Sequence, residues 1–306
     1  MSDDLIREVR ERARSVLDAA RLSPGESERL RCVADSARTV GPLDAYTVVP
    51  TSFAEGLNEL AGDSSTPARR RALFRVIQQL VLDQLDSGTF AALPPRCRAE
   101  QLIQLRRLAT LPDDQAEWLG LNSDILHKEL GLASLRLHAA AAQLIDPRCG
   151  VPRSLVLKGG VSEVASRAAS FASLGGFKPL FQIHTHLSYL DRFDEEGWDE
   201  CYRVCAELFA VYPACLGMFG ASWFYDPNLE TISPRLGYLR EVPSHGGARL
   251  MLMADEGHFV QDAIATSPTR RKLYESGQYK PRSFMLVWGR ADMLQWASQH
   301  PGTPAP

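Results

Sequence analysis

Long apolar runs, an excess of basic residues and an export signal are all missing from this sequence. No stretch of the 306 residues reaches the roughly 18 apolar residues that a membrane span needs. The formal net charge of -3 gives no electrostatic footprint for binding DNA or RNA. The N-terminus, MSDDLIREVRERARSVLDAA, is charged and amphipathic, unlike a secretory signal or a transit peptide. We therefore expect a soluble, cytoplasmic protein that binds neither nucleic acid nor membrane.

Paired cysteines are missing too. The six cysteines are scattered, and no two of them form a CxxC pair. Cys201 and Cys205 lie four residues apart in a helical pattern, where they would share one face. In a chain with no export signal we expect reduced thiols that serve as small buried hydrophobes.

Nucleotide-binding and hydrolase motifs are absent as well. The stretch LKGGVSE, residues 157–163, is neither a Walker loop nor GxGxxG, and it is expected to form a tight turn. The GASWF segment around Ser222 lacks the G-x-S-x-G nucleophile elbow. No familiar motif therefore fixes the reaction.

What the sequence does contain is enough apolar material for a sizeable core, at 45% hydrophobic and 23% charged residues. Its first 132 residues show helical periodicity, and we expect them to form an all-helical domain. The clearest helix covers 67–86: Thr66 is placed to cap it, Pro67 suits its first turn, and Gly88 follows its end.

After residue 132 the pattern changes to strands that alternate with helices. We expect an α/β or α+β domain with a mixed sheet over 133–299, followed by a frayed tail at 300–306. Two consecutive strands, RLGYLREV and ARLMLMAD, are expected around a turn at SHGGA.

The apolar run LFQIHTH ends in two histidines. Alternate residues of a strand face the same way, so His184 and His186 would project side by side. They could hold a zinc or iron ion with a third ligand such as His245, or act as an acid/base pair. Alternatively, they are two hydrogen-bonded histidines at a strand end.

The same motif resembles the His-x-His that ends the first strand of the amidohydrolase and PHP metal-hydrolase families. Only about 120 residues follow it, fewer than the roughly 250 of an eight-fold barrel, so that fold is not expected.

Two further segments carry candidate substrate groups. In ATSPTRRKLYESG, Ser267 and Pro268 can start a helix that Gly277 ends, which places Arg270 and Arg271 in the first turn. Cations oppose the helix dipole there, so they are candidate ligands for a substrate anion, or else surface charges or internal ion pairs.

The second segment, GASWFYDP, places four candidate residues at a strand end. Ser222, Trp223, Tyr225 and Asp226 could line a small-ligand pocket, with Tyr225 and Asp226 taking part in catalysis. Ordinary packing at the edge of a core explains them equally well.

The stretch ATSPTRRKLYESGQYKPRSFMLVW resembles the end of GNAT acyltransferases, in which a helix of the type A-x-x-L-Y-x-x-x-G leads into a strand. That resemblance implies a GNAT-like fold, an acyl-coenzyme A donor and Tyr274 as general acid. The family's Q/R-x-x-G-x-G/A loop is absent, so the donor site would be a divergent one.

The leading hypothesis is a cytoplasmic enzyme that acts on a small polar or anionic metabolite through His184 and His186. A GNAT-like acyltransferase is the first alternative. The second is a non-catalytic protein whose helical half binds a protein partner.

Overall fold

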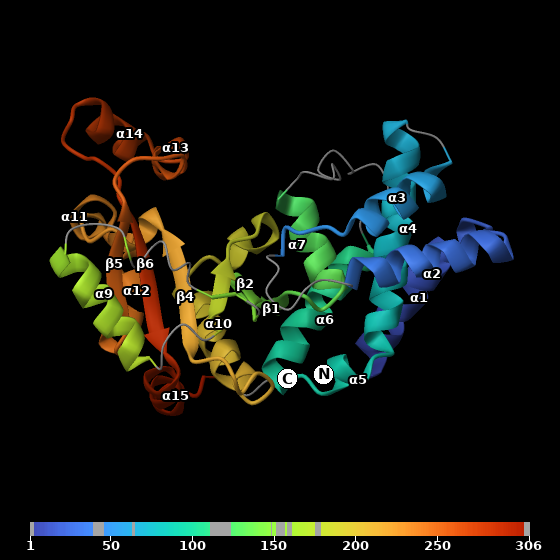
Figure 1. Ribbon diagram of the computed structural model, residues 1–306, viewed down its shortest axis with the longest axis horizontal. Coiled ribbons are helices and arrows are strands. Elements are labelled where there is room, and N and C mark those ends of the chain that lie inside the picture. Colours follow the sequence, from blue (N-terminus) through green and yellow to red (C-terminus); the bar gives the residue numbers. More distant parts are fainter. Residues whose placement is uncertain are drawn as a thin grey trace. The chain divides into compact units, whose positions relative to one another are not determined.

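The computed structural model describes residues 3–38, 46–62, 65–110, 124–147, 149–150, 157, 161–174 and 179–302. The chain divides into two compact units (Figure 1). The first unit takes Met1–Arg148, Thr185–Asp191 and Thr303–Pro306, and the second takes Cys149–His184 and Arg192–Gly302. The predicted mixture of a helical front half and a mixed-sheet region is confirmed.

The first unit is built from helices and one hairpin. Its elements are α1 (Asp3–Ala19), α2 (Pro24–Arg38), α3 (Thr51–Ala61), α4 (Thr66–Leu85), α5 (Gly88–Ala91), α6 (Pro95–Ala109), α7 (Asp124–Ala133), β1 (His138–Ala140), β2 (Gln143–Asp146) and the 3-10 helix η2 (Leu187–Arg192), of which only the last residue belongs to the second unit. Strands β1 and β2 pair antiparallel.

Helix α4 is the centre of this unit because it contacts α1, α2, α3, α6 and α7. Its start lies one residue earlier than expected: Ser65, rather than Thr66, caps it by accepting the N–H of Ala68. Ser65 has the extended backbone that a capping residue needs, whereas Thr66 is already the first helical residue.

The second unit contains a four-stranded run in the order β3-β4-β6-β5. The strands are β3 (Phe181–His184), β4 (Gly217–Ser222), β5 (Arg249–Ala254) and β6 (Ser283–Gly289). Strands β3 and β4 are parallel, and the other two pairs are antiparallel. The helices are α9 (Val161–Ser173), α10 (Glu195–Leu208), η3 (Trp223–Tyr225), α11 (Leu229–Ile232), η4 (Pro234–Leu236), α12 (Tyr238–His245), α13 (Phe259–Ala265), α14 (Pro268–Glu275) and α15 (Arg290–Gln299).

Apolar side chains cover both faces of these strands. On one face, Phe171 of α9 packs into a cluster with Phe219 and Met285. The adjacent strand residues point the other way. There Trp288 meets Tyr202 of α10, at a ring distance of 5.1 Å, and Trp296 of α15, at 5.5 Å.

The expected strand at RLGYLREV is wrong, because residues 234–245 form η4 and α12. Leu239 and Pro243 are buried four residues apart, which is the spacing of one helix face. Residues 246–248 then form a turn that leads from this helix into β5.

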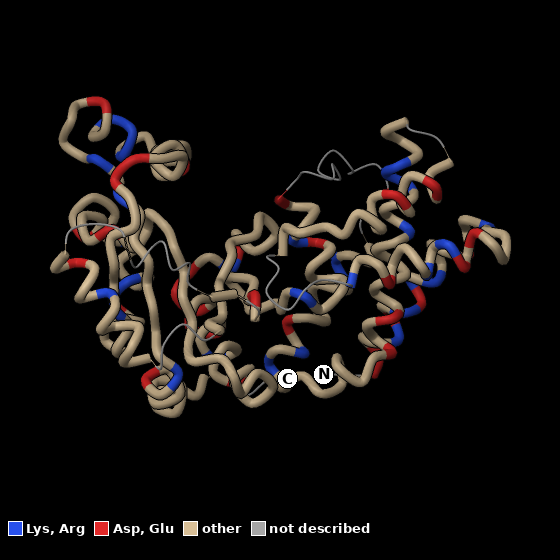
Figure 2. Tube along the Cα trace, viewed as in Figure 1, with Lys and Arg blue, Asp and Glu red and all other residues tan. Residues whose placement is uncertain are grey.

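Basic and acidic residues are interspersed along the helices of each unit (Figure 2). No helix of the described residues is long and apolar enough to cross a bilayer.

Candidate active site

The histidine pair lies where the chain passes from the second unit back to the first. Strand β3 ends at His184, so its alternation does not determine where His186 points. His184 belongs to the second unit and His186 to the first. In the second unit, a ring nitrogen of His184 lies within 4.8 Å of the Cys149 sulfur. Imidazole and thiolate are ligands that zinc accepts, and the predicted zinc or iron site stays a prediction.

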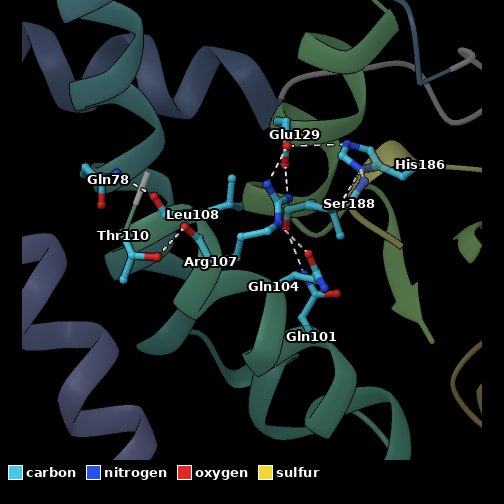
Figure 3. A network of polar contacts seen from close by, with 10 residues as sticks. Gln78, Gln101, Gln104, Arg107, Leu108, Thr110, Glu129, His186 and Ser188 are labelled. Carbon is cyan, nitrogen blue, oxygen red and sulfur yellow. Dashed lines mark hydrogen bonds and ion pairs between the residues drawn. The ribbon is translucent and has the colours of Figure 1, made fainter. Parts of the chain in front are cut away.

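His186 lies inside the first unit, with only 3% of its surface exposed. Its Nδ1 accepts the backbone N–H of Ser188 at 3.0 Å and lies 2.5 Å from the Ser188 Oγ. Its Nε2 lies 3.4 Å from Oε1 of Glu129 (Figure 3). A backbone N–H can only donate, so Nδ1 carries no proton. The ring is therefore the neutral tautomer with its hydrogen on Nε2, which faces the carboxylate.

Glu129 of α7 is a buried carboxylate held by an arginine of α6. Nη1 and Nη2 of Arg107 donate to its two oxygens at 2.8 and 2.5 Å. Burial raises the pKa of Glu129, but the neighbouring His186 ring and the charge and hydrogen bonds of Arg107 lower it by more, so the net pKa lies below its usual value. Glu129 is therefore ionised, and it can stabilise a positive charge that develops on His186.

Tyr189 packs against the His186 ring on the inner side of this site. The ring of Tyr189 stands edge-on to His186, with ring centres 5.8 Å apart. Its hydroxyl is buried without a hydrogen-bond partner among the described residues. Burial raises the pKa of Tyr189 well above its ordinary value, so the phenol is neutral. The site thus combines one fixed carboxylate, one neutral imidazole and two hydroxyls.

Two of the predicted residues are engaged by internal partners in the second unit. Asp226 is buried and accepts the backbone N–H and the guanidinium of Arg282 at 3.1 and 3.0 Å. Arg270 is 3% exposed, donates to the carbonyl of Ala263 and to Ser233 Oγ, and stacks 4.7 Å above the ring of Trp223. These contacts join separate segments of the unit. Asp226 is paired with the opposite charge of Arg282, whereas Arg270 contacts neutral acceptors and an aromatic ring.

The other residues predicted near them have more local environments. Ser222 begins η3 by accepting the N–H of Phe224. Tyr225 is buried, its hydroxyl has no hydrogen-bond partner in the described chain, and burial raises its pKa far above the usual value. Arg271 and Tyr274 lie on the exposed surface of α14, where Arg271 donates to the carbonyl of Ala265.

His245 lies at the end of α12 and lines an open groove of about 600 Å³ in the second unit. Glu195, Asp199, Asp292 and His300 also line this groove, together with neutral residues. Three carboxylates without a lysine or arginine among the lining residues would repel an anionic metabolite. Of the small polar or anionic metabolite expected from the sequence, this groove therefore fits only the polar alternative.

Sequence analysis missed Ser188, Glu129 and Arg107. Glu129 gave one detectable signal, because it lies among the apolar residues Leu126 and Leu130 of a short helix. An acid on such a face needs a buried partner. Its partners, however, lie 22 and 57 residues away in the chain, at Arg107 and His186.

Comparison with protein-family models, curated proteins and solved structures finds no match to this chain.

Proposed function

We propose that this chain is a cytoplasmic enzyme that cleaves an ester or thioester of a small polar metabolite, with Ser188 as nucleophile and His186 as base. The observation that carries the proposal is the alignment of three groups: Ser188 Oγ lies 2.5 Å from Nδ1 of His186, and Nε2 of the same ring lies 3.4 Å from the Glu129 carboxylate. In unrelated folds, serine is activated when its hydroxyl lies beside a histidine base and a carboxylate orients that base.

Each half of the reaction moves one proton through Nδ1 of His186. Ser188 Oγ bonds to the substrate carbonyl carbon while its hydrogen passes to Nδ1 of His186. When the tetrahedral intermediate collapses, the bond to the leaving group breaks and that group takes the proton from Nδ1. Water then attacks the acyl-serine in the same way, and Ser188 leaves with its hydrogen restored. The charged ring exists only between these steps, because a protonated Nδ1 can no longer accept the Ser188 backbone N–H.

Several side chains of η2 are exposed, which favours access of a substrate to Ser188. His186 is buried, whereas Ser188 is only half-buried. Leu187 and Leu190 are 64% and 55% exposed, and residues three apart eclipse each other in a 3-10 helix. They therefore form one apolar strip beside the serine, against which the substrate's acyl chain can pack.

A fluorophosphonate probe, which reacts with activated serines, tests the proposal. We expect mass spectrometry to locate the label on Ser188, and Ser188→Ala to abolish it. His186→Gln should slow labelling at least about 100-fold, which is the low end for a lost general base. Ser298→Ala, an exposed serine of α15, is the matched control and should label like the wild type. Absence of label from Ser188 in the folded wild type would overturn the proposal.

A GNAT-like acyl transfer is the second candidate, and the parallel strand pair favours it. Strands β3 and β4 pair at Phe181–Met218 and Gln182–Phe219, before their carboxyl ends. Open α/β sheets bind ligands at the carboxyl ends of their parallel strands, which is where the acyl-coenzyme A donor would lie. Tyr274, the general acid that the resemblance implies, is 38% exposed.

Thermal unfolding with acetyl-coenzyme A tests this second candidate. A donor that binds only the native state raises the melting temperature, and Ser188→Ala should leave that increase unchanged. An unchanged melting temperature at saturating donor would remove the candidate without affecting the first proposal.

A further inference from the structure

A second cavity, of about 300 Å³, opens in the first unit among α2, the end of α3 and the start of α4. Arg29 of α2 and Arg71 and Arg75 of α4 line it, together with Glu26 and Glu59 and small or apolar residues. Its volume is at the lower end of the range for small-molecule sites. It shares no residue with the Ser188–His186–Glu129 site.

The charges of Arg29 and Arg75 act on Glu26 and help to lower its pKa, but the three arginines keep their hydrogen-bond donors available. Within the described part of the chain, none of them makes a hydrogen bond or a close ion pair. Arg71 and Arg75 are four residues apart, so they lie on the same face of α4 and repel each other. Arg29 adds a third positive charge from a different helix. A bound anion would attract all three arginines and so offset the repulsion between them. Guanidinium groups bind phosphate through paired hydrogen bonds.

The two acids of the cavity differ in whether their carboxylates already accept hydrogen bonds. Glu26 accepts the backbone N–H and the hydroxyl of Ser23 at 2.8 and 2.6 Å, so its carboxylate already caps the start of α2. These bonds to Ser23, and then the charges of Arg29 and Arg75, lower the pKa of Glu26 and keep it ionised. Glu59 is exposed at the end of α3 and is available to accept hydrogen bonds from a ligand.

We infer that this cavity binds a small phosphate monoester, with its phosphate on Arg29, Arg71 and Arg75 and its hydroxyl groups on Glu59. Three arginines against two acids leave a positive site, which selects an anion. The acid at its edge disfavours a fully anionic ligand and favours one that also carries hydrogen-bond donors.

Isothermal titration of the full chain with glycerol 3-phosphate, inorganic phosphate and glycerol tests the inference. We expect glycerol 3-phosphate to bind more tightly than inorganic phosphate, and glycerol not to bind. The double variant Arg71→Gln, Arg75→Gln should lose at least ten-fold in affinity. Arg69→Gln, on the same helix but outside the cavity, is the matched control and should bind like the wild type. Glu59→Gln should weaken glycerol 3-phosphate more than inorganic phosphate.

Circular dichroism spectra that match the wild type would show that each variant is folded. No binding of either phosphate, or equal losses in the double variant and in Arg69→Gln, would overturn the site. Equal affinity for the two phosphates would overturn its assignment to a monoester. Fluorophosphonate labelling of Ser188 is independent of all these outcomes.

Discussion

His186 contacts the backbone of the neighbouring 3-10 helix with one ring nitrogen and a buried carboxylate with the other. Its Nδ1 bonds the start of η2, and its Nε2 faces a carboxylate that Arg107 holds in place. One ring nitrogen is therefore fixed as an acceptor and the other as a donor. A base needs this fixed tautomer before it can take a proton from Ser188.

Glu129→Gln should destabilise the first unit. At neutral pH we expect a loss of about 3 kcal/mol, because removal of one partner leaves Arg107 without its buried countercharge. The lowered pKa of Glu129 means that its contribution is present above the ordinary glutamate value of 4.5 and is lost as the pH falls through the folded value.

Urea unfolding of the full chain at neutral and acidic pH measures this difference. The gap between wild type and variant should be widest at neutral pH and shrink in acid. Glu11→Gln, which changes an exposed acid of α1, should have no effect at either pH. A Glu129→Gln variant as stable as the wild type at neutral pH would contradict the account of this ion pair.

Only part of the site was predictable from sequence. His186 is visible in the sequence because it belongs to a pair of histidines that follows an apolar run, and such a local change of pattern marks the end of a strand. Its partners could not be predicted because Arg107 and Glu129 come from α6 and α7, and helix packing alone brings them to η2. The strand alternation that would align His184 with His186 does not hold, because β3 ends at His184, two residues before His186.

The sequence predicts the ends of a helix well where capping residues mark them. Helix α14 begins after Ser267, whose Oγ accepts the N–H of Arg270, as expected. It ends with Gly277 at φ +72°, and the N–H groups of Gly277 and Gln278 bond the carbonyls of Tyr274 and Leu273. This is the Schellman arrangement. By contrast, the short apolar pattern of RLGYLREV, residues 235–242, fits both periods, so it predicts a strand where the structure forms η4 and α12.

Gly277→Ala should lower the free energy of unfolding by about 1 kcal/mol, because a Cβ is strained at that positive φ. No neighbouring atom would contact the new methyl group, so the loss would come from the backbone alone. Gly25→Ala, in the first turn of α2 with open space around it, should be neutral or stabilising. Equal effects of the two substitutions in thermal unfolding would contradict this explanation.

Burial across the whole molecule sets the reactivity of its six thiols. Cys32 is exposed and Cys149 half-buried, whereas Cys97, Cys201, Cys205 and Cys215 are buried. The prediction that Cys201 and Cys205 are small core residues on one face of α10 is confirmed. The four buried sulfurs lie in both units, so they report on the packing of each.

Titration with a thiol reagent should therefore show one fast phase in the native protein, from Cys32, and a slower one from Cys149. The four buried thiols should react only after denaturant is added, and Cys32→Ser should remove the fast phase. Fast reaction of more than two thiols without denaturant would show that the cores of the units are not packed as described.

The position of the His186 proton tests the central claim most directly. Nitrogen NMR of the imidazole, assigned by comparison with His186→Gln, distinguishes a protonated ring nitrogen from an unprotonated one. At neutral pH we predict a proton on Nε2 and none on Nδ1, and Glu129→Gln should shift the Nε2 signal. A proton found on Nδ1 would contradict the account, because the ring could then neither accept the Ser188 N–H nor take a proton from its hydroxyl.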